Sequence, residues 1–309
     1  MKVLTLQNEK NIWTQIFPNF SDNHYVFVLP PVNILGDAYI ALGFIKAFED
    51  LTGLEVLVAA SANHASHRKA ILLHGIAAHK VAYIDFSSFR VIASLYTNGP
   101  FYRYLEGYPE KKLWASRVAK VIHPGFGTGD LEWASKGIQL FDLYRILLGL
   151  GPRAKFQHHV ASHQDELQAE VLFSKHKLRR GRTVVVFPDA NSIAGIEMEV
   201  VRSLVEEFQR CEFDVIVDSN KEEFSDIVPV TYIDLRLVVP FLNICGFAVI
   251  TRSGMADITL QSAAQKLILY PNKMLQSVYS NIKEGRDIFE LIISGSEDWA
   301  EVTRRFTRS

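Results

Sequence analysis

The sequence predicts an α/β protein made of two Rossmann-like domains that face each other across a cleft. Three observations favour this class. Apolar strands alternate with helical segments, each half of the chain contains a strand–loop–helix–strand series, and 309 residues exceed the size at which one core commonly stops growing. Apolar strands separated by helices indicate parallel sheets covered by helices on both faces.

The first half supplies one such series. The run 25–29 predicts a strand because it is apolar and is followed by a Pro-Pro turn. The other strands expected in this half are 54–60, 81–85 and 118–122, and the helices are 38–50 and 141–150. The loop 125–129 is rich in glycine, but its spacing is not G-x-G-x-x-G, so a dinucleotide-binding dehydrogenase is not predicted.

The second half shows the same pattern. Its expected strands are 183–187, 213–217, 247–250 and 267–270, and its expected helices are 197–210, 235–245 and 255–264. The basic run 175–182 before it is either a solvated helix end beside a hinge or a patch for phosphate or a membrane surface. We therefore divide the chain as follows: an N-terminal domain at 1–168, a linker at 169–182, a second domain at 183–295 and a helix at 296–309, which either returns to the first domain or packs on its own.

Composition narrows the classes of function. The chain has 33 basic and 34 acidic residues, a net charge of −1, so no global charge favours nucleic acid as a partner. Its start lacks the pattern of a signal peptide and no apolar run is long enough to cross a bilayer, so we expect a cytoplasmic protein. Cys211 and Cys245 support neither a disulfide framework nor zinc. The pair His64/His67, and the pair His158/His159 followed by His163, have ligand-like spacing but lack clear partners, so we expect solvated helix histidines and no metal.

The loops of the second half are the candidate ligand-binding segments. Helix N-termini at the carboxyl ends of parallel strands bind anions, because their backbone N–H groups are unpaired. The segment 251–257 is the strongest candidate, and its alternative is a capped turn with an exposed arginine; the loop 187–195 is as well explained by an ordinary capped turn. The candidate residues are Arg252, Ser253, Gly254, Met255, Asp257, Asn191, Ser192 and Lys273, the last being otherwise a surface lysine.

A second set of candidates lies in the first half. Gly36 and Asp37 precede a predicted helix, so the Asp37 carboxylate is placed either to take a proton from a hydroxyl or only to cap backbone amides. The loop around 125–129 brings His123 and Asp130 toward the predicted cleft, although a purely structural loop explains it nearly as well.

These loops resemble a known family, the two-domain GT-B glycosyltransferases, nearest to the heptosyltransferase-like group, glycosyltransferase family 9. The similarity is carried by 36–42, 187–192 and 233–270. The resemblance implies that Asp37 is the catalytic base and that the backbone amides of 253–255 hold a nucleotide diphosphate. It also places the acceptor, with Gly36, His123 and Asp130, on the first domain, and the nucleotide sugar on the second.

The sequence departs from that group at two places. Residues 196–199 stand where the family has a Lys-Arg-Trp element that grips the donor, and Arg252 stands where an acidic residue commonly precedes the Ser-Gly pair. The resemblance therefore implies a nucleotide-sugar donor, but it does not imply ADP-heptose in particular.

The implied activity is an inverting, metal-independent transfer of a sugar to a glycan or lipid-linked hydroxyl acceptor in surface polysaccharide or lipopolysaccharide assembly. No cofactor is expected, since the nucleotide sugar is a substrate. The protein is expected in the cytoplasm, and peripheral association with the inner face of the membrane is a further expectation. Two alternatives stay open: a sugar-nucleotide epimerase or hydrolase of the same fold, and a non-catalytic nucleotide-binding subunit of another transferase.

Overall fold

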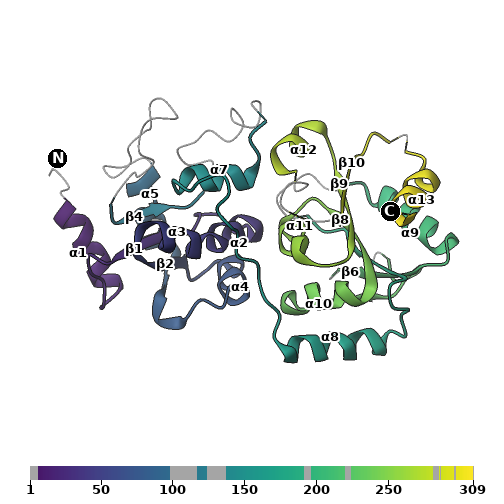
Figure 1. The fold of residues 1–309 in the computed structure, drawn as a ribbon, viewed down its shortest axis with the longest axis horizontal. Helices are drawn as coiled ribbons and strands as arrows, with labels where there is room; N and C mark the ends of the chain where they lie inside the picture. Colours follow the sequence, from purple (N-terminus) through teal and green to yellow (C-terminus); the bar gives the residue numbers. More distant parts are fainter. Residues whose placement is uncertain are drawn as a thin grey trace. The chain divides into compact units, whose positions relative to one another are not determined.

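The computed structural model describes residues 6–97, 117–123, 137–190, 196–219, 224–280, 285, 287–295 and 297–308. It forms two compact units, 1–158 and 159–309, each built on its own sheet (Figure 1). The division lies earlier than the expected boundary at 168. Its physical reason is α8 (His163–Lys175), which packs on α10 (Leu235–Cys245) and buries Ala169 and Phe173 in the core of the second unit.

The first unit contains a parallel sheet in the order β3-β2-β1-β4. Its strands are β1 (His24–Val28), β2 (Glu55–Ser61), β3 (Val81–Ile84) and β4 (Ala119–Val121). Its helices are α1 (Leu6–Ile16), α2 (Leu35–Gly43), α3 (Ile45–Thr52), α4 (Ala65–Leu73), α5 (Phe86–Thr97) and α7 (Leu140–Leu147), with a 3-10 turn at Ala78–Lys80. Val26 pairs with Leu57 on one side and Ala119 on the other, so β1 is central.

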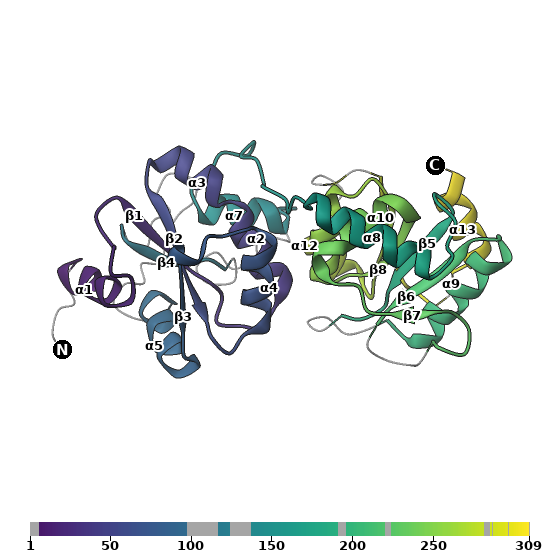
Figure 2. The ribbon, with the colours of Figure 1, turned by 90° about the horizontal axis from the view of Figure 1, so that it is seen from below.

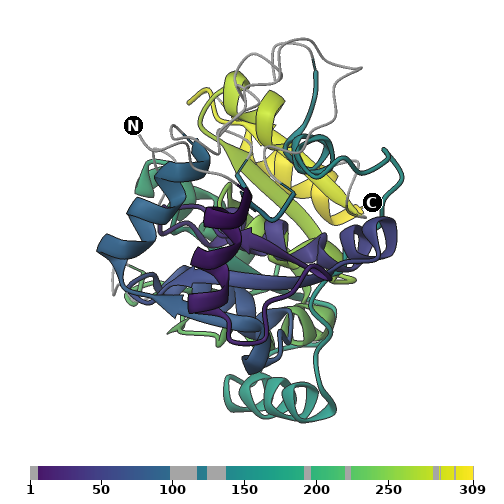
Figure 3. The ribbon, with the colours of Figure 1, turned by 90° about the vertical axis from the view of Figure 1, so that its left-hand side faces the viewer.

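Helices cover both faces of this sheet, as the wholly apolar strands predict. Val26 and Val28 face a layer that includes Phe89 of α5 and Trp13 of α1, the dark purple helix in Figure 3. The alternate residues Tyr25 and Phe27 point the other way and contact Phe48 of α3. Figure 2 shows α3 and α5 on opposite sides of the strands.

The second unit contains a six-stranded parallel sheet in the order β10-β9-β8-β5-β6-β7. Its strands are β5 (Thr183–Phe187), β6 (Asp214–Asp218), β7 (Val230–Thr231), β8 (Gly246–Thr251), β9 (Gln265–Tyr270) and β10 (Ile288–Ile292). Its remaining helices are α9 (Met198–Arg210), α11 (Gly254–Ile258), α12 (Lys273–Tyr279) and α13 (Trp299–Arg308), with a 3-10 turn at Thr259–Gln261. The first strand lies in the middle of the sheet, which is the strand order of a doubly wound nucleotide-binding fold.

The C-terminal helix packs within its own unit. Phe306 of α13 is buried and its ring contacts Phe208 of α9 and Phe247 of β8. Of the two expectations for this segment, its contacts fit packing on its own domain, because the sheet needs an apolar cover on the α9 face.

The basic run before β5 is engaged in ordinary structural contacts. Arg179 forms an ion pair with Asp214 at the start of β6, with Nη2 2.9 Å from Oδ1, and its backbone N–H donates to the same carboxylate. Arg182 donates to the carbonyl of Glu212. No helix in the described part of the chain has the length and apolar character needed to cross a membrane.

The predicted helix at 38–50 begins earlier and is broken in two. Gly43 ends α2, and its carbonyl accepts a hydrogen bond from the backbone N–H of Gln157 at 2.7 Å. The Phe156 ring lies directly on Gly43, so closely that a Cβ there would stand 2.1 Å from a ring carbon. Tyr39, Phe44 and Phe141 hold that ring in place.

We therefore expect Gly43→Ala to destabilise the chain by about 1–3 kcal/mol, because the packed ring must shift to admit one methyl group. Chemical denaturation measures the change. The matched control is Gly151→Ala, since a Cβ at Gly151 meets nothing within 4 Å. Equal stability of the two variants would contradict the close packing of Phe156 on Gly43.

Candidate functional site

The first candidate site lies where the strand order of the first sheet reverses, between β1 and β4. In open α/β sheets, ligands bind beyond the carboxyl ends of the strands at this point. Asp37 lies in the first turn of α2, which follows β1, and His123 follows the end of β4. The His123 Nε2 atom is 3.3 Å from Asp37 Oδ2, with 19% and 14% of the two side chains exposed. Segments far apart in the sequence thus bring a base and a carboxylate together.

Asp37 does not cap its helix. The helix begins at Leu35, its N-cap is Ile34, and no side chain caps it, so the expectation that Gly36 and Asp37 precede the helix is wrong. Because Asp37 lies within the first turn, its carboxylate is available for contacts beyond the helix. The buried Gly36 supplies backbone close to it.

Tyr144 of α7 is a third member of this group. Its hydroxyl donates a hydrogen bond to the Asp37 carbonyl at 3.0 Å and lies 3.5 Å from Asp37 Oδ1. Tyr144 thus holds the backbone of Asp37, and His123 orients its carboxylate. The sequence analysis missed Tyr144, although its place in a helix after the fourth strand could have suggested it.

His67 ties the loop before α2 to the rest of the sheet edge. The Ser61 N–H donates to His67 Nδ1 at 3.0 Å, so Nε2 carries the hydrogen and donates to the Pro30 carbonyl at 3.0 Å. Asn33 Oδ1 accepts from the Ser66 N–H at 3.1 Å. These bonds cross-link the loops that follow β1 and β2.

His67 is fully buried, and burial lowers its pKa to about 4, so the ring is neutral at ordinary pH. His64 and His159 are buried as well, whereas His163 at the start of α8 is exposed. The expectation of solvated histidines is therefore wrong for His64, His67 and His159, because neighbouring segments cover them, and it fits His163.

The second candidate site lies at the corresponding reversal in the second sheet, between β5 and β8. Ser253 follows β8 and is the N-cap of α11, where its side chain accepts a hydrogen bond from the Met255 N–H at 3.3 Å. Gly254 is the first residue of that helix, so the strand-to-helix turn falls where the sequence predicted it. Lys273 is exposed at the start of α12, one strand further along. Asn191, Ser192 and Asp130 lie outside the described residues.

Arg252 is held inside the second unit rather than presented to a ligand. Only 3% of its side chain is exposed, and it forms a bidentate ion pair with the buried Asp257, at 2.8 Å from Nη2 to Oδ1 and 3.2 Å from Nη1 to Oδ2. The guanidinium also donates to the carbonyls of Ser253 and Tyr279, and it lies over the Tyr279 ring.

Four of the five guanidinium N–H groups have partners in this arrangement. The alternative of an exposed arginine on a capped turn is therefore wrong, because the ion pair takes Arg252 and Asp257 into the core together. Their contacts fix the backbone that carries Ser253 and Gly254.

Breaking this pair should be costly. Asp257→Asn leaves a buried guanidinium without its counter-charge, and we expect a loss of about 3–5 kcal/mol in the free energy of unfolding. The matched control is Glu301→Gln, which breaks the exposed Arg304–Glu301 pair and should cost less than about 0.5 kcal/mol. Urea denaturation measures the free energy of unfolding of both variants. A similar small loss in both would contradict the burial of the Arg252 guanidinium.

A pair of carboxylates lies beside this site at the ends of β5 and β6. Asp218 is largely buried, and burial, with a further contribution from Asp189, raises its pKa to about 6. Its Oδ1 accepts from the Ile233 N–H at 2.9 Å, and Asp189 accepts from the Ser219 hydroxyl at 2.8 Å. The sequence analysis passed over both residues. Within the described residues, no group of three or more potential ligands gathers that could hold a metal ion.

The raised pKa of Asp218 makes a prediction about stability and pH. The folded chain favours the protonated acid, so this carboxyl contributes stability at low pH that is lost as pH rises through about 6. Asp218→Asn keeps the acceptor for Ile233 without the charge, and we expect it to stabilise the chain at pH 7–8 by about 1–2 kcal/mol and to flatten its pH dependence between about 4 and 6.

Thermal unfolding of the chain and of the variant, measured from about pH 4 to pH 8, tests both expectations. The control is Asp226→Asn, since Asp226 pairs with Arg202 at 2.9 Å and its pKa is lowered by that hydrogen bond. This control should lose a little stability at neutral pH rather than gain it. A destabilised Asp218→Asn variant at pH 8 would contradict the burial of a charged carboxylate.

Comparison with known proteins identifies the architecture. No protein-family model and no curated protein matches the sequence. Among solved structures, a glycosyl transferase family 9 protein from Veillonella parvula matches with a TM-score of 0.58 and 12% identity, over 93% of this chain and 92% of that one. E. coli ADP-heptose lps heptosyltransferase II matches with a TM-score of 0.56 and 12% identity, over 88% and 91% of the chains. E. coli heptosyltransferase WaaC with ADP matches with a TM-score of 0.52 and 13% identity, over 91% and 98%.

These structures come from the group that the loops of the sequence resemble. The chain has their fold, the GT-B fold of glycosyltransferases with two Rossmann-like domains, and the predicted fold class is confirmed. At these identities the similarity establishes the fold alone, so the chemistry has to be argued from the residues at the two strand-order reversals.

Proposed function

We propose that this protein is a glycosyltransferase that moves a sugar from a nucleotide-sugar donor to a hydroxyl acceptor. The observation that carries the proposal is the Asp37–His123 pair at the strand-order reversal of the first sheet, in a chain with the GT-B fold. A largely buried carboxylate oriented by an imidazole is suited to removing a proton from a bound hydroxyl.

In the proposed reaction, Asp37 accepts the proton of the acceptor hydroxyl. The acceptor oxygen then forms a bond to the anomeric carbon, and the bond from that carbon to the nucleotide diphosphate breaks with inversion. The leaving diphosphate carries away the electron pair. His123 keeps the carboxylate oriented and Tyr144 holds the backbone that carries it, which matters because proton transfer depends on a well-aligned base.

The donor is assigned to the second unit. The backbone N–H groups of Ser253 and Gly254 would hold the diphosphate, that of Met255 would join them on release from the Ser253 side chain, and the exposed Lys273 would add charge. Asn191 and Ser192 are proposed to contact the nucleotide or sugar of the donor. Arg252 and Asp257 would act on the donor through the position of the Ser253 loop. This scheme needs no cofactor and no metal ion.

The acceptor class is proposed from the neighbours. One of them is named as a lipopolysaccharide heptosyltransferase, so we propose a glycan or lipid-linked acceptor of surface polysaccharide assembly, used at the cytoplasmic side of the membrane. Either a hexosyl or a heptosyl donor suits the scheme. Gly36, and Asp130 in the loop after His123, are proposed to line the acceptor side.

The test begins with thermal shifts against UDP, GDP, ADP, CMP and their sugar conjugates, which identify the donor by mass action. Release of the nucleoside diphosphate with a panel of glycan and glycolipid acceptors then measures transfer. Asp37→Asn should leave donor affinity unchanged and lower kcat at least about 100-fold, because the base is lost while the shape is kept. The matched control is Asp22→Asn, an exposed carboxylate of the same unit, which should retain full activity.

Three results would count against the proposal. Undiminished kcat in Asp37→Asn would remove Asp37 as the base. Conversion of the donor at the same rate without any acceptor would indicate an epimerase or hydrolase. Donor binding without turnover under every acceptor would indicate a non-catalytic subunit.

A further inference from the structure

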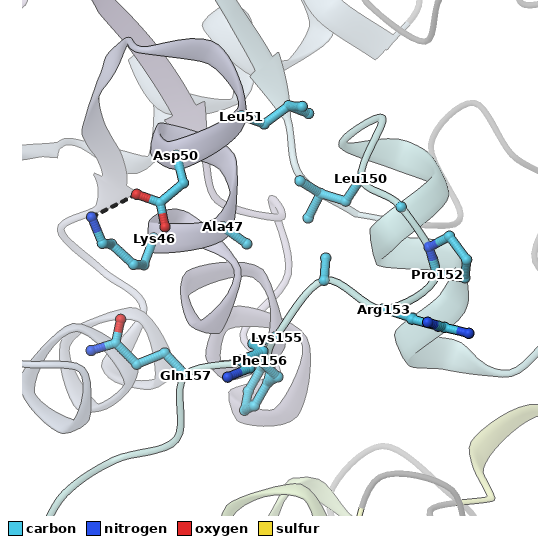
Figure 4. Close-up of a pocket in the computed structure, with 12 residues that line it drawn as sticks. Lys46, Ala47, Asp50, Leu51, Leu150, Pro152, Arg153, Lys155, Phe156 and Gln157 are labelled. Atoms are coloured by element: carbon cyan, nitrogen blue, oxygen red, sulfur yellow. Dashed lines mark ion pairs between the residues drawn. The ribbon is translucent and has the colours of Figure 1, made fainter.

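A third candidate binding site lies in the first unit, and Asp37 does not line it. An open pocket of about 690 Å³ separates α3 from the segment 150–157 that follows α7. Figure 4 shows the side chains of α3 on one side of the pocket and those of 150–153 on the other. This volume falls in the range of pockets that bind small organic molecules.

The residues that line the pocket are held in place by hydrogen bonds and packing with their neighbours. Phe156 is locked against Gly43, and the Gln157 N–H donates to the Gly43 carbonyl at 2.7 Å. The buried Arg145 donates from Nε to the Ala154 carbonyl at 3.2 Å, and the Ala154 N–H donates to the Gly151 carbonyl at 2.9 Å. Because this backbone is already ordered, binding of a ligand would carry little cost in conformational entropy.

The lining combines an apolar floor with a basic rim. Ala47, Leu51, Leu150, Pro152, Ala154 and Phe156 supply the apolar surface. Leu51 leaves 56% of its surface exposed, and it adds to the contiguous apolar lining. Such a surface favours a ligand with a hydrocarbon body.

The rim carries three basic residues and one acid. Lys46 pairs with Asp50 at 2.7 Å across one turn of α3. Arg153 and Lys155 are exposed on the facing segment, and within the described residues neither forms an ion pair. The excess of positive charge is local, since the whole chain has a net charge of −1. Guanidinium and ammonium groups beside an apolar floor complement an anionic head on an apolar chain.

From these observations we propose that the pocket binds the acyl chain of a phosphate-bearing lipid, with the phosphate held by Arg153 and Lys155. Asp37 belongs to α2, whereas α3 and the segment 150–157 line the pocket, and Asp37 is not among the lining residues. The bound lipid would therefore attach the first unit to the membrane that contains it without occupying the site beside Asp37. This inference does not depend on the proposed transferase activity.

Isothermal titration of the full chain with dodecyl phosphate, below its micelle concentration, tests the proposal. Dodecyl maltoside and inorganic phosphate are the comparison probes. We expect one dodecyl phosphate per chain, bound at least tenfold more tightly than dodecyl maltoside, and no measurable binding of inorganic phosphate. Binding of the neutral detergent with equal affinity, binding of free phosphate with equal affinity, or no binding of dodecyl phosphate would each overturn it.

Variants separate the two parts of the pocket. Arg153→Gln with Lys155→Gln should weaken dodecyl phosphate at least tenfold, whereas Lys69→Gln with Arg117→Gln removes two exposed charges elsewhere in the same unit and should change nothing. Ala47→Phe fills the floor and should abolish binding. Leu51→Asp is the second test of the floor, because this exposed side chain can be changed without loss of the fold. Unchanged affinity in a folded Ala47→Phe or Leu51→Asp variant would place the ligand elsewhere and overturn the proposal.

Discussion

The hydrogen bonding of parallel strands is the constraint on which this structure depends. Parallel neighbours require a crossover, and each crossover returns the chain to the same edge of the sheet before the next strand begins. With β1 and β5 in the middle of their sheets, the chain must reverse its direction of winding beside them. The segments that carry Asp37, His123 and Ser253 lie at these two reversals because each directly follows the carboxyl end of a strand beside the reversal.

Buried polar contacts then turn these loops into defined surfaces. His67 joins the loops after β1 and β2 through both ring nitrogens, and Arg252 joins the end of β8 to α11 and to the end of α12. Each of these side chains is expensive to bury and is accepted because its hydrogen-bonding groups find partners. The consequence is a precise backbone at the two places where the fold gathers its candidate ligand-binding groups.

The first unit separates two kinds of surface on two successive helices. The beginning of α2 carries a carboxylate oriented by an imidazole, which is a setting for proton transfer. The space between α3 and the segment 150–157 has an apolar floor and a basic rim, which is a setting for an amphiphile. Phe156, packed on the glycine between the two helices, stabilises the break that separates them. Changes in one surface can therefore be studied without altering the other.

The sequence by itself determined the α/β class, most of the strands and the strand-to-helix turn at Ser253, because apolar runs and caps are local signals. It also singled out Asp37. It did not reveal that Arg252 and Asp257 pair inside the core, that His67 is a buried cross-link, or that Tyr144 and His123 converge on Asp37. Only the tertiary structure decided these points, since each depends on which distant segment fills the space around a side chain, and the spacing of residues along the chain carries no record of that.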